Sequence, residues 1–334
     1  MKKVVTLFSI FFLAFSINSK AGFFRDLFYG KTKAKYKVAV VLSQGKLGDK
    51  GFNDMAYEGL KKADKNFNDL QISYTEPNST AELESSLRNY AKEGYHLIIA
   101  NGFEFEHPCY NVAKDFPDTK FAIIDSFVDL PNVASLVFNE EEGSFLVGAL
   151  SAMTTKTDQV GFVGGLYVPL IEKFYLGYQK GVKYIDPSIN VLEEYIGGDN
   201  PFNDQKKGYE LASTMSDQGA DIIYHAAGGS GLGVINAAKD NNIYAIGVDK
   251  NQDAVAPGFV LTSMVKKVDF VVFDIIKNFI NNNFKSGEKV YGISNGGIGL
   301  TNFQYSKKIV TPDIISRVNE LKSQIINKEI IVLR

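Results

Sequence analysis

Four aspartates stand after predicted strands, at the edge where parallel sheets bind their ligands. Asp125 and Asp249 follow their strands directly. Asp49 and Asp204 lie further along two polar loops that also follow strands. Because an ionised carboxylate only accepts hydrogen bonds, these residues suit a ligand that presents hydroxyl or amino donors. Sugars and nucleosides fit such a site, whereas phosphates and carboxylic acids fit it poorly.

The scarcity of arginine narrows the ligand class further. An anionic ligand is normally held by the planar fork of an arginine guanidinium. None of the arginines lies at the end of a predicted strand; they are Arg25, Arg88, Arg317 and Arg334. The formal net charge is −2 and the pI is near 6.0, so the chain lacks the excess of positive charge that is typical of nucleic-acid-binding proteins.

Two phenylalanines in the same loops are placed to sandwich a flat ring. Phe52 opens the first predicted helix, and Phe202 lies in a loop of the second half of the chain. Aromatic faces on both sides of a ring would add stacking energy to binding. Phe52 also falls on the apolar face of its helix, so a place in the core is the alternative for that residue.

No catalytic constellation accompanies these residues. The glycine-rich run 228–233 follows a strand, but valine at position 234 breaks the dinucleotide-binding spacing, and the run lacks the spacing of a nucleophile elbow. A calcium loop beginning at Asp249 is excluded because Ala254 replaces the required glycine. We therefore predict no enzyme activity, cofactor or metal. The histidines His96, His107 and His225 are scattered without metal-ligand spacing.

Alternating strands and helices must position these residues. Short β-branched runs alternate with helical patterns, which is typical of βαβ units and a parallel sheet. In the first helix, apolar residues recur every three to four positions, so one face packs on the sheet. The first series has predicted strands at 38–42, 70–74, 97–100, 121–124 and 133–138, and helices at 52–67, 83–91 and 110–115.

A second series of the same kind follows the first. At 334 residues, the chain exceeds the length at which a single core usually stays undivided. We therefore predict an α/β protein with two doubly wound Rossmann-like lobes. The second series has predicted strands at 160–163, 191–196, 222–225 and 244–248, and helices at 141–153, 170–184, 205–218 and 233–242.

The first residues have the pattern of an export signal. Two lysines precede the apolar run 4–17, and a polar stretch leads to Ala21, where we expect cleavage. The run is shorter than the roughly 20 residues of a spanning helix, although a retained anchor is the alternative. Residues 22–36 are predicted to be a linker. The single cysteine, Cys109, is far from the cleavage site, so no lipid-bearing N-terminal cysteine is predicted.

Seven short motifs occur together along the chain. They are GDKGFN at 48–53, FAIID at 121–125, EEGSF at 141–145, GFVGG at 161–165, YHAAGG at 224–229, GVD at 247–249 and LTSMVK at 261–266. With this combination, the chain from about Lys37 to Val332 resembles the basic membrane protein family of solute-binding proteins. It is similar to bacterial purine nucleoside receptors that serve ABC transporters.

The resemblance implies a type I periplasmic-binding fold with three hinge crossings. The first lobe would comprise residues 37–139 plus about 262–290, and the second lobe residues 140–261 plus about 291–334. The chain would thus return to the first lobe near Thr262. Many relatives carry a lipid on a cysteine that starts the mature chain, and this sequence has none there. The exported protein is therefore expected to be periplasmic or associated with the outer face of the membrane.

The resemblance also implies a role for each residue of the site. Two rings would stack on the faces of a purine, two carboxylates would read polar edges of the ligand, and an aspartate with a lysine would hold the ribose hydroxyls. Two further residues would contact the ligand. Phe52 and Phe202 would be the stacking rings, and Asp49 and Asp125 the carboxylates that read polar edges. Asp249 and Lys266 would hold the ribose, and Asn53 and Gly229 would be the further contacts.

The function that follows is capture of a purine nucleoside, such as adenosine, guanosine or inosine, for delivery to an ABC transporter permease. The protein is expected to be a monomer. One alternative is a nucleoside- or sugar-sensing binding protein or surface adhesin, which would use the same fold. The other is a nucleoside-cleaving enzyme, which would need a nucleophile activator or a phosphate site, and the sequence shows neither.

Overall fold

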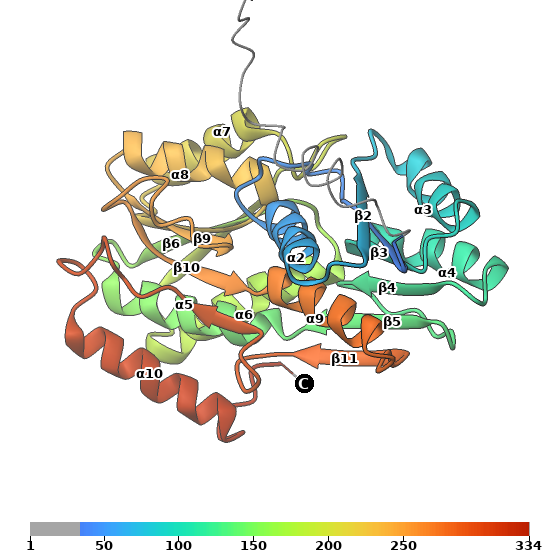
Figure 1. Ribbon diagram of the computed structural model, residues 1–334. Coiled ribbons are helices and arrows are strands. Elements are labelled where there is room, and N and C mark those ends of the chain that lie inside the picture. Colours follow the sequence, from blue (N-terminus) through green and yellow to red (C-terminus); the bar gives the residue numbers. More distant parts are fainter. Residues whose placement is uncertain (1–33, 334) are drawn as a thin grey trace, which may run out of the picture.

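The computed structural model describes residues 34–333, which form two α/β lobes placed next to each other (Figure 1). The predicted export signal and residues 22–33 of the predicted linker lie outside the described residues. Within residues 34–333, no helix is both long and apolar enough to span a membrane. Each lobe has one sheet with helices on both faces, which confirms the predicted α/β class.

One parallel sheet forms the first lobe. Its strands are β1 (Tyr36–Val41), β2 (Leu70–Thr75), β3 (Leu97–Asn101), β4 (Lys120–Ile124), β5 (Val133–Phe138) and β11 (Gly287–Tyr291). They lie in the order β11-β5-β4-β3-β1-β2, and every neighbouring pair is parallel. All residues of β3 are buried, as expected for a strand that helices cover on both faces.

The second lobe repeats this arrangement with one difference at its edge. Its strands are β6 (Gln159–Gly164), β7 (Asn190–Tyr195), β8 (Ile222–Ala226), β9 (Tyr244–Asp249), β10 (Val260–Lys266) and β12 (Ile298–Leu300). They lie in the order β12-β10-β9-β8-β6-β7, and β12 runs antiparallel to β10. In both lobes the first strand lies between the second and the third. This reversal of strand order opens a ligand crevice at the carboxyl ends of the strands.

Helices cover both faces of each sheet. In the first lobe these are α2 (Phe52–Asn66) and α9 (Val268–Ile280) on one face, and α3 (Leu83–Lys92) and α4 (Glu106–Asp115) on the other. In the second lobe they are α5 (Glu140–Thr154) and α6 (Pro169–Ile185), and α7 (Gln205–Asp217) and α8 (Gly231–Asp240). The helix α10 (Pro312–Ile326) packs on α5.

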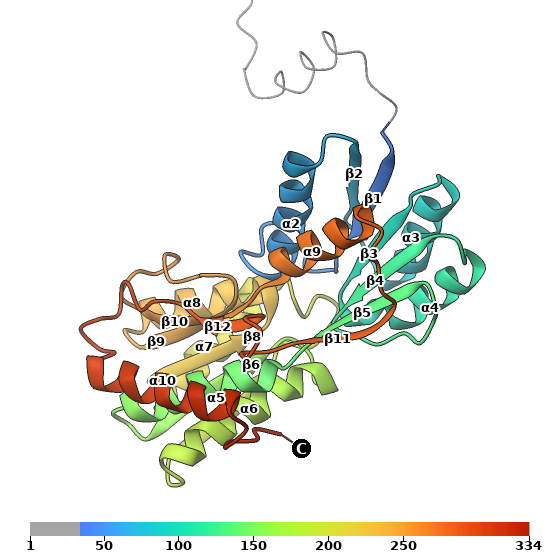
Figure 2. The same cartoon turned by 60° about the horizontal axis from the view of Figure 1, so that its bottom comes forward.

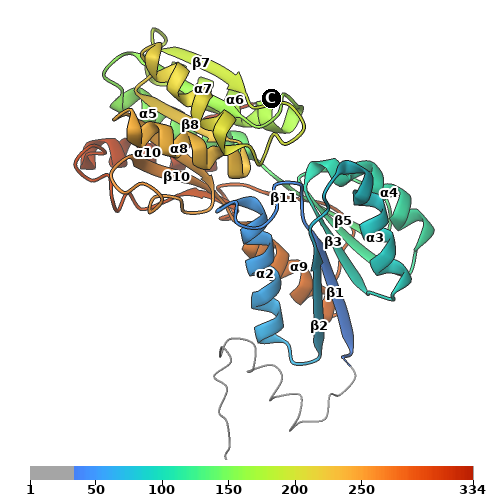
Figure 3. The same ribbon diagram turned by 90° about the horizontal axis from the view of Figure 1, so that it is seen from above.

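The apolar pattern of α2 explains its place. Ala56, Leu60 and Ala63, which recur at helical spacing, are fully buried against the sheet. Figure 3 shows that the start of α2 reaches the second lobe, while the rest of the helix lies along the first. Phe52, the first residue of α2, is therefore carried to the junction between the lobes.

The chain crosses between the lobes three times, and one crossing differs from its expected place (Figure 2). The crossings follow β5, β10 and β11. We expected the second crossing near Thr262, but β10 pairs with β9 in the second sheet, with Val265 opposite Asp249. The chain therefore leaves the second lobe only after Lys266, because the whole strand is needed to extend that sheet.

Candidate ligand-binding site

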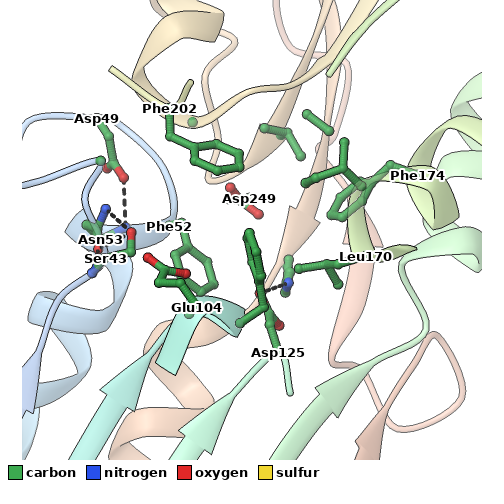
Figure 4. A pocket seen from close by; sticks show the side chains of 18 residues that line it. Ser43, Asp49, Phe52, Asn53, Glu104, Asp125, Leu170, Phe174, Phe202 and Asp249 are labelled. Atoms are coloured by element: carbon green, nitrogen blue, oxygen red, sulfur yellow. Dashed lines mark hydrogen bonds and ion pairs between the residues drawn. The ribbon is translucent and has the colours of Figure 1, made fainter. Parts of the chain in front are cut away.

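A cavity lies between the two lobes, with a volume of about 560 Å³ that includes solvent space at its opening. The first lobe contributes segments that follow β1, β3 and β4, and the second lobe contributes segments at the ends of β6 to β10. The cavity thus lies where both parallel sheets direct their strand ends (Figure 4).

The structure brings together all of the residues proposed for the site except Gly229 and Asp204. Gly229 is buried beside the cavity, where a Cβ atom would lie 3.2 Å from the backbone oxygen of Phe202. Asp204 turns away, and its carboxylate caps α7 by accepting from the backbone N–H of Lys207 at 2.9 Å. The lining includes Asp49, Phe52, Asn53, Asp125, Phe202, Asp249 and Lys266.

Asp125 and Asp249 occupy equivalent places in the two lobes. Asp125 directly follows β4 and Asp249 is the last residue of β9, and these are the fourth strands of their lobes. Each has left-handed backbone geometry, with φ of 68° and 63° respectively. This conformation costs free energy for residues other than glycine, although aspartate tolerates it better than most. The shared strain turns both carboxylates into the cleft.

Lys266 is a buried cation that joins the lobes. Its Nζ lies 2.6 Å from Asp125 Oδ2 in the first lobe and 3.0 Å from Glu140 Oε1 at the start of α5. The ammonium also lies over the ring of Phe52, 5.2 Å from the centroid, and over that of Phe138 at 4.8 Å. Burial opposes the charged form, but the surrounding carboxylates raise the pKa of Lys266, so the cation persists.

The carboxylates around Lys266 keep acceptor capacity. Burial raises the pKa of Asp125 to about 6, although the ammonium of Lys266 opposes this shift. Within residues 34–333, Asp125 Oδ1 and Glu140 Oε2 have no hydrogen-bond partner. Buried acceptors without partners are costly, so they are suited to a ligand that brings hydroxyl donors.

Asp249 is the second acceptor group of the cleft. Its side chain makes no hydrogen bond to residues 34–333, and one carboxylate oxygen would lie 3.6 Å from a Cβ atom at Gly51 in the other lobe. Burial raises its pKa to about 7, a shift that the charge of Lys266 reduces. The group therefore changes charge close to neutral pH.

Asp49 and Asn53 shape the loop after β1. The carboxylate of Asp49 accepts from the backbone N–H groups of Gly51 at 2.9 Å and Asn53 at 2.8 Å, which caps the start of α2. The side-chain oxygen of Asn53 accepts from the backbone of Ser43 and from the side chain of Asn101, at 3.0 and 3.1 Å. Both side chains thus hold the loop in place, in addition to any contact with a ligand.

Aromatic rings from both lobes line the cavity. Phe52 comes from the first lobe and Phe202 from the second. The ring of Phe202 lies directly over Gly165, where any side chain would collide with it. Phe103, which sequence reasoning missed, meets Phe202 edge-on with 6.2 Å between the ring centroids. The two lobes therefore present facing apolar surfaces to a flat ring.

Glu104 and Phe174 are further lining residues that were not predicted. Glu104 lies in the short turn η2 (Phe103–Phe105) after β3, and burial raises its pKa to about 7. Its position could have been found from the sequence, because Glu104 stands three residues after Asn101, where β3 ends. Phe174 had no such signal, because it reads as one more apolar residue of the amphipathic helix α6.

Comparisons with known proteins bear on this geometry. A family model described as ABC transporter substrate-binding protein, PnrA-like, matches residues 36–334. The chain belongs to this family. A Lactococcus lactis protein described as ABC transporter nucleoside-binding protein BmpA is 33% identical to this PnrA-like chain over 328 residues, covering 91% of this chain and 90% of that protein.

Two more relatives support the family and the fold. Basic membrane protein A from Borreliella afzelii is 34% identical over 89% of this PnrA-like chain and 91% of its own length. The crystal structure of an ABC transporter solute-binding protein from Aeropyrum pernix superimposes with a TM-score of 0.82 at 29% identity, covering 89% of this chain and 92% of that one. The predicted family and the type I two-lobed fold are thus confirmed.

Proposed function

We propose that this protein captures a purine nucleoside between its lobes and delivers it to an ABC transporter permease. The observation that carries the proposal is the pairing, in one cleft, of aromatic rings from opposite lobes with the acceptors around Lys266. The printed description of the Lactococcus lactis relative as nucleoside-binding supports the same ligand class.

The base would stack between Phe52 and Phe202. Because these rings belong to different lobes, a flat base that contacts both is bound only when the lobes are closed. A ligand shifts a conformational equilibrium by its differential affinity for the two states. Nucleoside binding would therefore stabilise the closed form, and that form would dock on the permease as a monomer.

The ribose would lie at the charged end of the cleft. Asp249 and the unpaired Oδ1 of Asp125 would accept from its hydroxyl groups. Lys266 has three N–H donors, two of which point at Asp125 and Glu140, so one remains for a ribose oxygen. A phosphorylated sugar would meet several carboxylates and no arginine, which disfavours nucleotides.

We propose that the protein acts outside the cytoplasm, as its N-terminal pattern predicts. Cys109 is buried in α4, so this thiol is not a site for a lipid anchor. The exported protein would be periplasmic or associated with the outer face of the membrane, and it would carry no lipid on a cysteine. Detecting the processed protein in the extracytoplasmic fraction, with an N-terminus after Ala21, tests this point.

Thermal unfolding with and without nucleosides tests the ligand. At one hundred times its dissociation constant, a ligand stabilises a protein by about 2.7 kcal/mol. We expect adenosine, guanosine or inosine to raise the unfolding temperature, with calorimetric titration giving one site. Phe202→Ala should weaken binding by roughly 2- to 10-fold, the range for loss of one stacking contact. Tyr110→Ala, which removes an exposed ring of α4, is the matched control.

The same experiment separates the alternatives. Nucleoside recovered intact after long incubation supports a binding protein, whereas free base or ribose 1-phosphate in the mixture favours the enzyme. Stabilisation by ribose alone would retain the fold but replace the ligand. Uptake of labelled nucleoside in cells that lack the protein distinguishes delivery to a permease from sensing.

A further inference from the structure

One carboxylate of the cleft has no role in the site described so far. Of the acidic residues that line the cavity, Asp49 caps α2, and Asp125 pairs with Lys266. Asp249 lies next to the Lys266 cluster, and the positive charge of that lysine acts on it. Glu104 remains, with its carboxylate against Gly102 and facing the backbone N–H of Gln44.

Glu104 lies beside Phe52 in the cavity, near enough to Asp125 for that carboxylate to raise the pKa of Glu104 further. In Figure 4 its carboxylate is beside the ring of Phe52, on the side of Ser43 and Asn53. The groups of the second lobe, Leu170 and Phe174, lie across the cavity from it. A base stacked on Phe52 with its ribose toward Lys266 would therefore turn its outer edge toward Glu104.

The outer edges of purines differ in their hydrogen-bond groups. Guanine presents N1–H beside a 2-amino group, and hypoxanthine presents N1–H, so each offers donors there. Adenine presents an N1 lone pair beside its 6-amino group. Above about pH 7, where Glu104 is ionised, its carboxylate has only acceptors, and one of its oxygens would oppose the adenine N1 lone pair. A site built to receive a donor discriminates strongly against an analogue that lacks it.

We propose that Glu104 selects the base by accepting a hydrogen bond from the N1–H of a 6-oxopurine, so that the cleft prefers guanosine and inosine to adenosine. This inference rests on the proposed nucleoside function. It adds a specificity-determining residue at the base edge, whereas the ribose contacts are common to all three nucleosides. Asp49, the other carboxylate at this end of the cavity, already accepts from the backbone N–H groups of Gly51 and Asn53.

Calorimetric titration of wild-type protein and Glu104→Gln with guanosine, inosine and adenosine tests the proposal. Hydrogen bonds to charged groups are strong enough that wild-type protein should bind guanosine roughly 10-fold or more tightly than adenosine. Glu104→Gln should lose about 10- to 100-fold in affinity for guanosine and inosine. Adenosine should bind the variant as well as or better than wild type, because the amide offers a donor and an acceptor to the adenine edge.

Two controls make the outcomes distinct. Glu93→Gln removes an exposed carboxylate of the same lobe and should leave all three affinities unchanged. An unfolding temperature close to that of wild-type protein shows that Glu104→Gln is folded. If wild-type protein prefers adenosine, or the variant keeps the wild-type order of affinities, this inference is wrong while the proposed function stands. If wild-type protein binds no nucleoside, the proposed function fails, and the inference fails with it.

Discussion

The side-chain nitrogen of Gln252 donates a hydrogen bond to the backbone oxygen of Lys50 across the cleft, at 3.2 Å. Its side-chain oxygen accepts from the backbone N–H of Val248 and lies 3.0 Å from Nε2 of the buried His225. Because a backbone N–H can only donate, the amide is held in one orientation. Beside it, Lys250 of the second lobe pairs with Glu58 of α2. These contacts join the lobes without involving the ligand.

The first prediction concerns this bond between the lobes. Gln252→Glu keeps the acceptor for Val248 but replaces the donor that reaches Lys50. A net hydrogen bond contributes about 0.5–1.5 kcal/mol, and the buried carboxylate that then faces the Lys50 oxygen adds to this cost, so ligand affinity should fall by at least about 2- to 10-fold. Titration calorimetry measures the affinity, and small-angle scattering should show a more open shape. Gln71→Glu, on an exposed position of β2, is the control, and equal effects of both changes would contradict the prediction.

The second prediction is that Asp249→Asn stabilises the empty protein while weakening binding. A carboxyl pKa raised to about 7 means that the folded state holds the proton more tightly than the unfolded state. The free energy of unfolding therefore falls as pH rises from about 4 to about 7, and the asparagine removes this cost. At about pH 8 the variant should melt a few degrees higher than wild type, and the difference should vanish near pH 4. A lower melting temperature at about pH 8 would refute this account.

The third prediction is the pH dependence of nucleoside binding. Hydroxyl donors are received by ionised carboxylates, and the pKa values of Asp125 and Asp249 are raised to about 6 and about 7. Binding of inosine should strengthen as pH rises from about 5 to about 7.5 and then level off, with proton release below pH 7. Calorimetry in two buffers of different ionisation enthalpy measures the released protons. A flat profile would show that these carboxyls do not contact the ligand.

The fourth prediction compares two adjacent lysines. Lys266→Met leaves the carboxylates of Asp125 and Glu140 buried without their cation, which should lower the free energy of unfolding by about 3–5 kcal/mol. Lys267→Met, at an exposed position, should change it by no more than about 0.5 kcal/mol. Urea unfolding measures both variants. Similar values for the two lysines would mean that the buried ion pairs contribute little.

The sequence predicts the framework well where local patterns are strong. Periodic apolar residues locate α2, and β-branched runs locate the strands as far as β9. The helix expected to start at residue 110 begins at Glu106, because Pro108 falls in its first turn, where a missing N–H breaks no intrahelical bond. The later elements β10, α9 and β11 were not predicted as such. The partners of β11 and α9, which are β5 and α2, are far away in sequence, so only the complete first lobe defines these two elements.

The site was predictable in part for the same reason. Asp125 follows β4 and Asp249 ends β9, positions that sequence patterns reveal. The network of Lys266 with Glu140 depends on a crossing strand meeting a helix start, and no local pattern indicates it. Asp49 and Asn53 were expected only as ligand contacts. Their hydrogen bonds to the backbone show that they also support the loop, a role that depends on three-dimensional geometry.

The three crossings govern when each lobe can be completed during synthesis. The edge strand β11 joins the first sheet only after β6 to β10 of the second lobe have been made. Until then β5 is an unpaired edge, a surface that tends to associate with other chains. The second sheet likewise lacks its edge strand until β12 has been synthesised. A nascent chain therefore cannot finish either lobe early, so the polypeptide stays incompletely folded until almost all of it has been synthesised.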